Sequence, residues 1–134
     1  MTPSDDAFDR LAAGVVLLDP EARVVRLNRA ALTIVEANDG FMLAGDTLRT
    51  LSLERTLVLR ELVDEAIKTG SPVGVGSGST MEVERPGNRQ PWAVLVLPLL
   101  RQMSPKWHAD AVAAVFIYEP ATRTPGAPET ESAR

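Results

Sequence analysis

The chain has 134 residues, of which 45% are hydrophobic and 24% charged, a composition typical of one ordinary globular domain. It contains no cysteine and one histidine, which excludes thiolate zinc sites, iron–sulfur clusters, cysteine nucleophiles and two-histidine motifs such as HExxH. A net charge of −4 predicts no large basic surface, so we expect no direct nucleic-acid binding by this chain.

The first half of the chain predicts a helix, a hairpin and a second helix. Apolar residues recur at helical spacing over Asp6–Ala13, within an N-terminal helical segment of residues 1–13. Two strands, Val15–Leu18 and Arg23–Leu27, then flank a proline-containing turn. Asn28 follows as a helix N-cap, and Asp39-Gly40 ends that helix.

The second half predicts one longer helix and several strands. We expect a loop over Phe41–Leu51, with at most a short helical turn. Ser52 is a plausible N-cap for an amphipathic helix that ends near Gly70. The remaining strands are expected at Thr80–Arg85, Trp92–Leu99 and Ala111–Tyr118.

The strand Trp92–Leu99 is apolar on both of its faces, which is typical of a strand in the middle of a covered sheet. The order of elements predicts an α+β domain with a five-stranded antiparallel sheet and helices packed on one face. Residues 121–134 are rich in proline, threonine and glutamate, so we expect a disordered linker toward an output module.

Two stretches of the sequence resemble a PAS domain. The segment from Gly14 to Ala31 is similar to the first PAS hairpin, which ends in an asparagine that starts the next helix; here that residue is Asn28. Ala93–Leu99 and the last strand are similar to PAS modules that precede LuxR-type helix-turn-helix modules in bacterial regulators. The resemblance covers about residues 7–120, with the domain expected at 14–120. The first turn departs from the family, since Glu21-Ala22 replaces the frequent Asp-Gly.

The resemblance implies an interior space between sheet and helices that holds a small ligand or is filled by side chains. Apolar periodicity does not separate these alternatives. The resemblance places the following residues nearest to that space: Val16, Leu18, Leu27, Ile34, Val35, Val63, Val94, Val96 and Phe116.

Other candidate chemistry in the sequence has a simpler interpretation. His108 lies in a polar connection with Ser104 and Asp110, without the nucleophile elbow of a triad, and we expect no haem, catalytic or metal site there. The segment Gly74–Thr80 follows a helix and enters a strand, the reverse of a phosphate loop. Glu82 and Glu84 share one strand face, as on a solvated edge. Trp92 and Trp107 are more typical of buried core than of ligand contact.

We therefore expect a non-enzymatic sensory or regulatory module of a bacterial signalling protein, most similar to the input part of a LuxR-type regulator. The lack of cysteine excludes a flavin-adduct photosensor, and we expect no cofactor. A homodimer is expected. The alternatives are a PAS dimerisation module that senses nothing, or the input domain of a histidine kinase. The acidic start lacks a signal peptide and the longest apolar run is far below about 18 residues, so we expect a cytoplasmic protein without a membrane segment.

Overall fold

The structure is a computed structural model, which describes residues 3–69, 79–99 and 108–120. Its helices are α1 (Pro3–Arg10), α2 (Arg29–Glu36) and α3 (Leu53–Thr69). Its strands are β1 (Gly14–Leu18), β2 (Val24–Leu27), β3 (Phe41–Ala44), β4 (Thr47–Thr50), β5 (Ser79–Val83), β6 (Trp92–Pro98) and β7 (Ala113–Tyr118). The expected α+β class is confirmed. Trp107, Ser104 and most of the Gly74–Thr80 loop lie outside the described residues, as does the expected linker 121–134.

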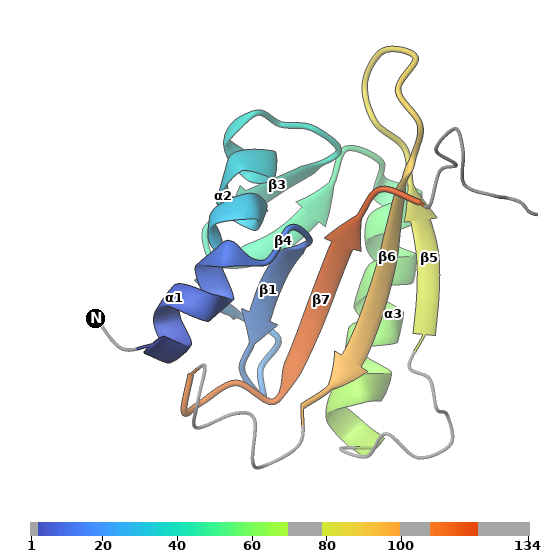
Figure 1. Ribbon diagram of the computed structural model, residues 1–134. Coiled ribbons are helices and arrows are strands. Elements are labelled where there is room, and N and C mark those ends of the chain that lie inside the picture. The colour runs from blue at the N-terminus through green and yellow to red at the C-terminus, as the bar shows by residue number, and fades with distance from the viewer. Residues whose placement is uncertain (1–2, 70–78, 100–107, 121–134) are drawn as a thin grey trace, which may run out of the picture.

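The five-stranded sheet is antiparallel throughout, with strand order β2-β1-β7-β6-β5 (Figure 1). The first and last strands of the chain pair at its centre, where Val16 lies opposite Val115. This pairing brings together two segments from near opposite ends of the domain's sequence. The predicted five-stranded antiparallel sheet is therefore confirmed.

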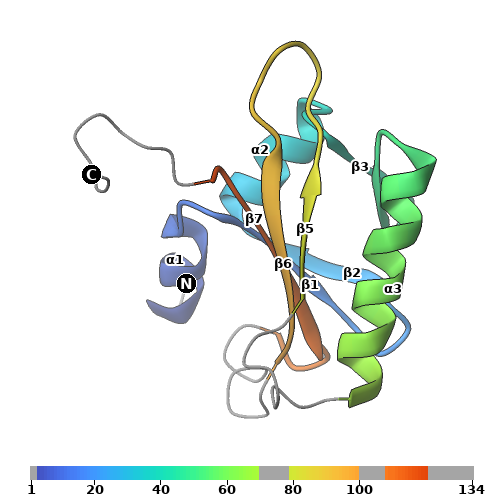
Figure 2. The ribbon, with the colours of Figure 1, turned by 90° about the vertical axis from the view of Figure 1, so that its right-hand side faces the viewer.

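Helices α2 and α3 and the β3–β4 hairpin cover one face of this sheet, which we call the inner face. Helix α1 lies against the opposite, outer face (Figure 2). The expectation that the helices pack on one face is wrong for α1. Val15 and Leu17 point outward from β1, and Phe8 of α1 covers them so completely that all three side chains are fully buried.

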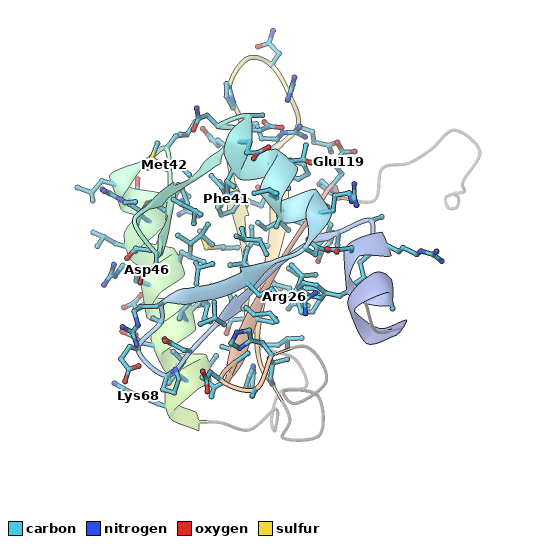
Figure 3. All side chains as sticks on the ribbon, turned by 90° about the vertical axis from the view of Figure 1, so that its left-hand side faces the viewer. Arg26, Phe41, Met42, Asp46, Lys68 and Glu119 are labelled. Carbon is cyan, nitrogen blue, oxygen red and sulfur yellow. The ribbon has the colours of Figure 1, made fainter. Side chains whose placement is uncertain are left out.

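The segment expected to be a loop contains a hairpin instead. Strands β3 and β4 form a separate two-stranded sheet, with Phe41 opposite Thr50, and their turn contains Gly45 with a φ of 66°. Phe41, which is labelled in Figure 3, and Leu48 point into the core. The strands have only four residues each, too short for a clear alternation of apolar and polar positions.

Helix boundaries follow local capping. Helix α1 begins at Pro3 and ends at Arg10, earlier than expected, and Leu11 beyond it is 40% exposed. The predicted caps of the other helices are confirmed, because Asn28 Oδ1 accepts from the Ala31 amide and Ser52 Oγ accepts from the Arg55 amide. Within the described residues, no helix is long and apolar enough to cross a membrane.

Candidate functional site

The residues expected to lie near an interior space gather on the inner face, with one exception. Val16, Val94 and Val96 are at most 1% exposed in the core of the inner face. Leu27 and Val35 are partly buried at its margin. The complete set on this face is Val16, Leu18, Leu27, Ile34, Val35, Val63, Val94 and Val96.

Phe116 is the exception, because it lies on the outer face. Successive side chains of a strand point to opposite faces, and in β7 Val115 and Ile117 point inward. Phe116 therefore points outward, where it packs against the cluster around Phe8. Both faces of β7 are apolar, so its sequence pattern does not say which set of residues points inward.

The space observed at the inner face is small. A cavity of about 60 Å³ lies between the β1–β2 turn, β4 and α3. Typical small-molecule pockets occupy about 300–1,000 Å³. Of the residues expected around the interior space, Leu18 and Val63 line this cavity. Its wall is formed by Leu18, Glu21, Ala22, Thr47, Leu48, Leu59, Arg60, Val63 and Asp64.

A larger, open groove lies near the point where α1 leads into β1. It has a volume of about 610 Å³ and runs between α2 and the adjoining ends of β6 and β7; we call it the α1/α2 groove. Leu11 and Tyr118, which are 40% and 37% exposed, contribute apolar surface, and Arg29 and Glu119 contribute charge. Its full lining is Asp9, Leu11, Ala12, Ala13, Arg29, Ala30, Thr33, Ile34, Trp92, Ile117, Tyr118 and Glu119.

A network of charged residues joins the end of α2 to the end of β7. The Asp39 carboxylate accepts from Arg85 Nε at 3.0 Å and from a second nitrogen of the same guanidinium at 2.7 Å. It also accepts from Arg89 at 2.9 Å. The remaining terminal nitrogen of Arg85 donates to Glu119 at 3.3 Å. Together with Trp92 we call these residues the Asp39 cluster.

Arg85 and Asp39 are largely withdrawn from water, since their side chains are 8% and 11% exposed. Hydrogen bonding from Arg85 is the main reason that the pKa of Asp39 falls below its ordinary value, and this effect exceeds the opposing effect of burial. The same bond raises the pKa of Arg85. Both groups are therefore charged at neutral pH, in a two-point pairing that fixes the guanidinium plane.

The backbone after α2 brings Asp39 to this position. Asn38 has a φ of 53° and Gly40 a φ of 94°, so the chain turns sharply on both sides of Asp39. A Cβ at Gly40 would lie 3.1 Å from the Glu84 carbonyl oxygen and 3.1 Å from Trp92 Cδ1. Glycine thus permits close contact between this turn and the strands, and the Trp92 indole donates to the Asp39 carbonyl oxygen.

Asn28 connects three segments and is fully buried. Besides capping α2, its Oδ1 accepts from the Val15 amide at 2.9 Å. Its Nδ2 donates to the carbonyl oxygens of Phe8 and Ala13 at 3.1 and 3.0 Å. The sequence pattern predicted the cap, but it did not predict the bonds to α1 and β1, which are 13 to 20 residues away.

The other polar candidates are not brought together. His108 Nδ1 accepts from the Asp110 amide at 3.2 Å, which is a local turn contact. Glu82 in the edge strand β5 and Glu84 just after it are both exposed, as expected for a solvated edge. Among the residues that the structure describes, no group of three or more histidine, aspartate or glutamate residues is placed to hold a metal ion.

No family model matches this chain, and no curated protein matches it significantly.

Proposed function

We propose that this chain is a PAS-like sensory or regulatory domain of a bacterial signalling protein, of the kind that precedes a LuxR-type output module. It works without catalysis, in the cytoplasm and as a homodimer, and it passes a conformational change to the module that follows it. The sheet order and the buried asparagine that starts α2 support this proposal.

The observation that carries the proposal is the bond between Arg85 and Glu119. Glu119 directly follows the last strand, and Arg85 connects it to Asp39 at the end of α2. A movement of α2 that displaces Asp39 thus alters the partner of Glu119. A ligand shifts the protein between two conformations only if it binds them with different free energies. The bond between Arg85 and Glu119 can differ between two positions of α2, so it can distinguish two such conformations.

The input site in this proposal is the α1/α2 groove, because the inner cavity of about 60 Å³ is too small for an ordinary ligand. The groove is lined by both Trp92 and Glu119, so a small molecule or a partner segment there contacts the Asp39 cluster directly. Arg29 and Asp9 add polar groups at its α1 end.

Native mass spectrometry, compared with the mass of the denatured chain, tests whether the input site holds a ligand. A stoichiometric extra mass is expected, and Ala30→Trp, which fills the groove, should remove it. Leu32→Trp is the matched control, since Leu32 is an exposed α2 residue outside the groove lining. Retention of the extra mass by Ala30→Trp would place the ligand elsewhere.

The relay is tested independently by NMR. Glu119→Gln should shift the Trp92 indole N–H signal, because Arg85 lies over the ring and loses one of its carboxylate partners. Glu82→Gln, on the exposed edge, should leave that signal unchanged. An unmoved indole signal in Glu119→Gln would refute the relay.

The tightly packed inner face favours a second candidate, a PAS-like dimerisation module that senses nothing. In that case the purified protein has no extra mass, and a symmetric dimer buries apolar surface such as Leu11 and Tyr118. Sedimentation equilibrium of Tyr118→Glu discriminates the two, because Tyr118 lines the α1/α2 groove. The sensor keeps this groove for its ligand, so the variant should stay dimeric, whereas the dimerisation module should dissociate into monomers.

A further inference from the structure

A second surface groove lies on the other side of the molecule from α1, between β4 and α3. It has a volume of about 350 Å³, and we call it the α3/β4 groove. Its lining consists of Ala44, Thr47, Arg49, Leu53, Thr56, Leu57 and Arg60. It shares no residue with the α1/α2 groove, so an inference about it does not depend on the proposed function.

Two leucines of this groove are exposed to solvent and take no part in the core. Leu53 is 68% exposed and Leu57 57% exposed, and their i, i+4 spacing places them on one side of α3. The core-facing side of this helix is already occupied by Leu59, Val63 and other buried residues. An isolated exposed leucine is ordinary, but two that line one groove are characteristic of a binding surface.

The charge in this groove has one sign. Arg49 and Arg60 are both exposed, and neither side chain forms a hydrogen bond or an ion pair with another described residue. The lining contains no acidic residue, although the whole chain carries a net charge of −4. The groove is thus a local basic and apolar surface on an acidic protein.

We propose that the α3/β4 groove binds an acidic amphipathic helix of a partner protein. Apolar side chains of that helix, spaced i and i+4, pack on Leu53 and Leu57, and its flanking carboxylates pair with Arg49 and Arg60.

Two other occupants fit the groove less well. A second copy placed symmetrically on the groove would bring its own arginines against Arg49 and Arg60, which is repulsive. Residues 121–134 contain Glu129 and Glu131, but no leucine, isoleucine, valine, methionine or aromatic residue, so they supply no large apolar anchor.

The test uses a synthetic helical peptide of about 18 residues, long enough to be helical in water, with leucines at i and i+4 flanked by glutamates. In ¹H–¹⁵N NMR titrations with the full chain, the shifted amides should map to α3 and β4. Arg60→Glu should weaken binding by about tenfold, or about 1.4 kcal/mol, because it replaces an attraction to the peptide's carboxylates by a repulsion. Lys68→Glu is the matched control, because Lys68 is exposed near the end of the same helix and lies outside both grooves (Figure 3). It should bind as the wild type does.

Exchanging the charges of peptide and groove tests whether binding depends on the pairing of opposite charges. A peptide with lysines in place of the glutamates should bind Arg49→Glu/Arg60→Glu better than it binds the wild type. Leu57→Asp should abolish binding of the acidic peptide, whereas Leu32→Asp, at an exposed leucine on α2, should not. Circular dichroism of each variant checks that it is folded.

Three results would overturn the proposal. The first is equal binding of the acidic and basic peptides. The second is self-association that Leu57→Asp removes, which would make a second copy the occupant. The third is binding to anionic phosphatidylserine vesicles, lost in Arg60→Glu, without binding of the peptide; this would make the groove a lipid-surface site.

Discussion

The guanidinium of Arg85 lies over the ring of Trp92, 3.8 Å from its centroid, while the same guanidinium pairs with Asp39. The indole N–H donates in turn to the Asp39 carbonyl oxygen. The backbone of Asp39 is therefore bound to β6 through Trp92, and its side chain is bound to the end of β5 through Arg85. This arrangement attaches the end of α2 to the sheet at the point where β7 ends.

Asp39→Ala should destabilise the protein strongly. Removing one partner of a buried ion pair leaves the other charge uncompensated, which costs about 3–5 kcal/mol. Arg89→Ala removes another contact of the same carboxylate, but the Arg89 side chain is 61% exposed, so its loss should cost about 1 kcal/mol or less. Urea unfolding measures both. Equal costs for the two variants would contradict the assignment of Arg85 as the principal partner.

The same carboxylate predicts how stability depends on pH. In the unfolded chain the Asp39 carboxyl has its ordinary pKa of 3.8, and in the folded protein hydrogen bonding from Arg85 lowers that pKa. A depressed folded pKa contributes stability above the unfolded pKa, and this contribution is lost as the pH falls through the folded pKa. The difference in unfolding free energy between wild type and Asp39→Asn should thus be large at about pH 7 and shrink below about pH 4.

A control variant separates this effect from general acid unfolding. Glu82→Gln removes an exposed carboxylate outside the Asp39 cluster and should not reproduce the pH-dependent difference. A difference between wild type and Asp39→Asn that stays constant from neutral pH to strongly acidic pH would show that charge on Asp39 is not the cause.

Local signals in the sequence predicted those parts of the fold that are decided locally. Asn28 and Ser52 cap helices through bonds to amides three residues away, so their positions before an apolar stripe are informative. The alternation in β6 likewise predicted that Val94 and Val96 share a face. In β7 this signal fails, because apolar residues occupy both faces, and the expectation from the resemblance that Phe116 lies near the interior space is wrong.

The Asp39 cluster was beyond sequence reasoning. Asp39 and Arg85 are separated by 46 residues, and each stands in a segment where a turn or a strand end is the ordinary interpretation. Their pairing results from the antiparallel register that places the end of β5 beside the turn after α2. A short-range signal was present only at Asp39-Gly40, which predicted the end of a helix but not a salt bridge.

Asn28→Ala should be among the most destabilising single changes outside the apolar core. It removes two bonds accepted by Oδ1 and two donated by Nδ2, and leaves buried backbone groups of Phe8 and Val15 without these partners. Each such group costs about 1–3 kcal/mol, so a total of about 3 kcal/mol or more is expected in urea unfolding.

Asn28→Asp separates the two roles of this side chain. It retains the acceptor for the Ala31 amide but loses both donors and places a carboxylate beside the Phe8 and Ala13 carbonyl oxygens. Hydrogen exchange should then show faster exchange in α1, with α2 less affected. Wild-type stability in this variant would mean that the bonds to α1 contribute little.

A pair of conservative substitutions asks whether the inner face is packed or holds ligand-sized space. Val63→Ile adds a methyl group beside the cavity of about 60 Å³ and should stabilise the protein by up to about 0.8 kcal/mol. Val94→Ile adds the same group where the side chain is fully buried, and overpacking there should cost about 1–3 kcal/mol. Urea unfolding measures both. Destabilisation by both changes would show that the cavity wall cannot accept a methyl group. Stabilisation by both would reveal space deeper in the core, and the input site would then move from the α1/α2 groove to the interior.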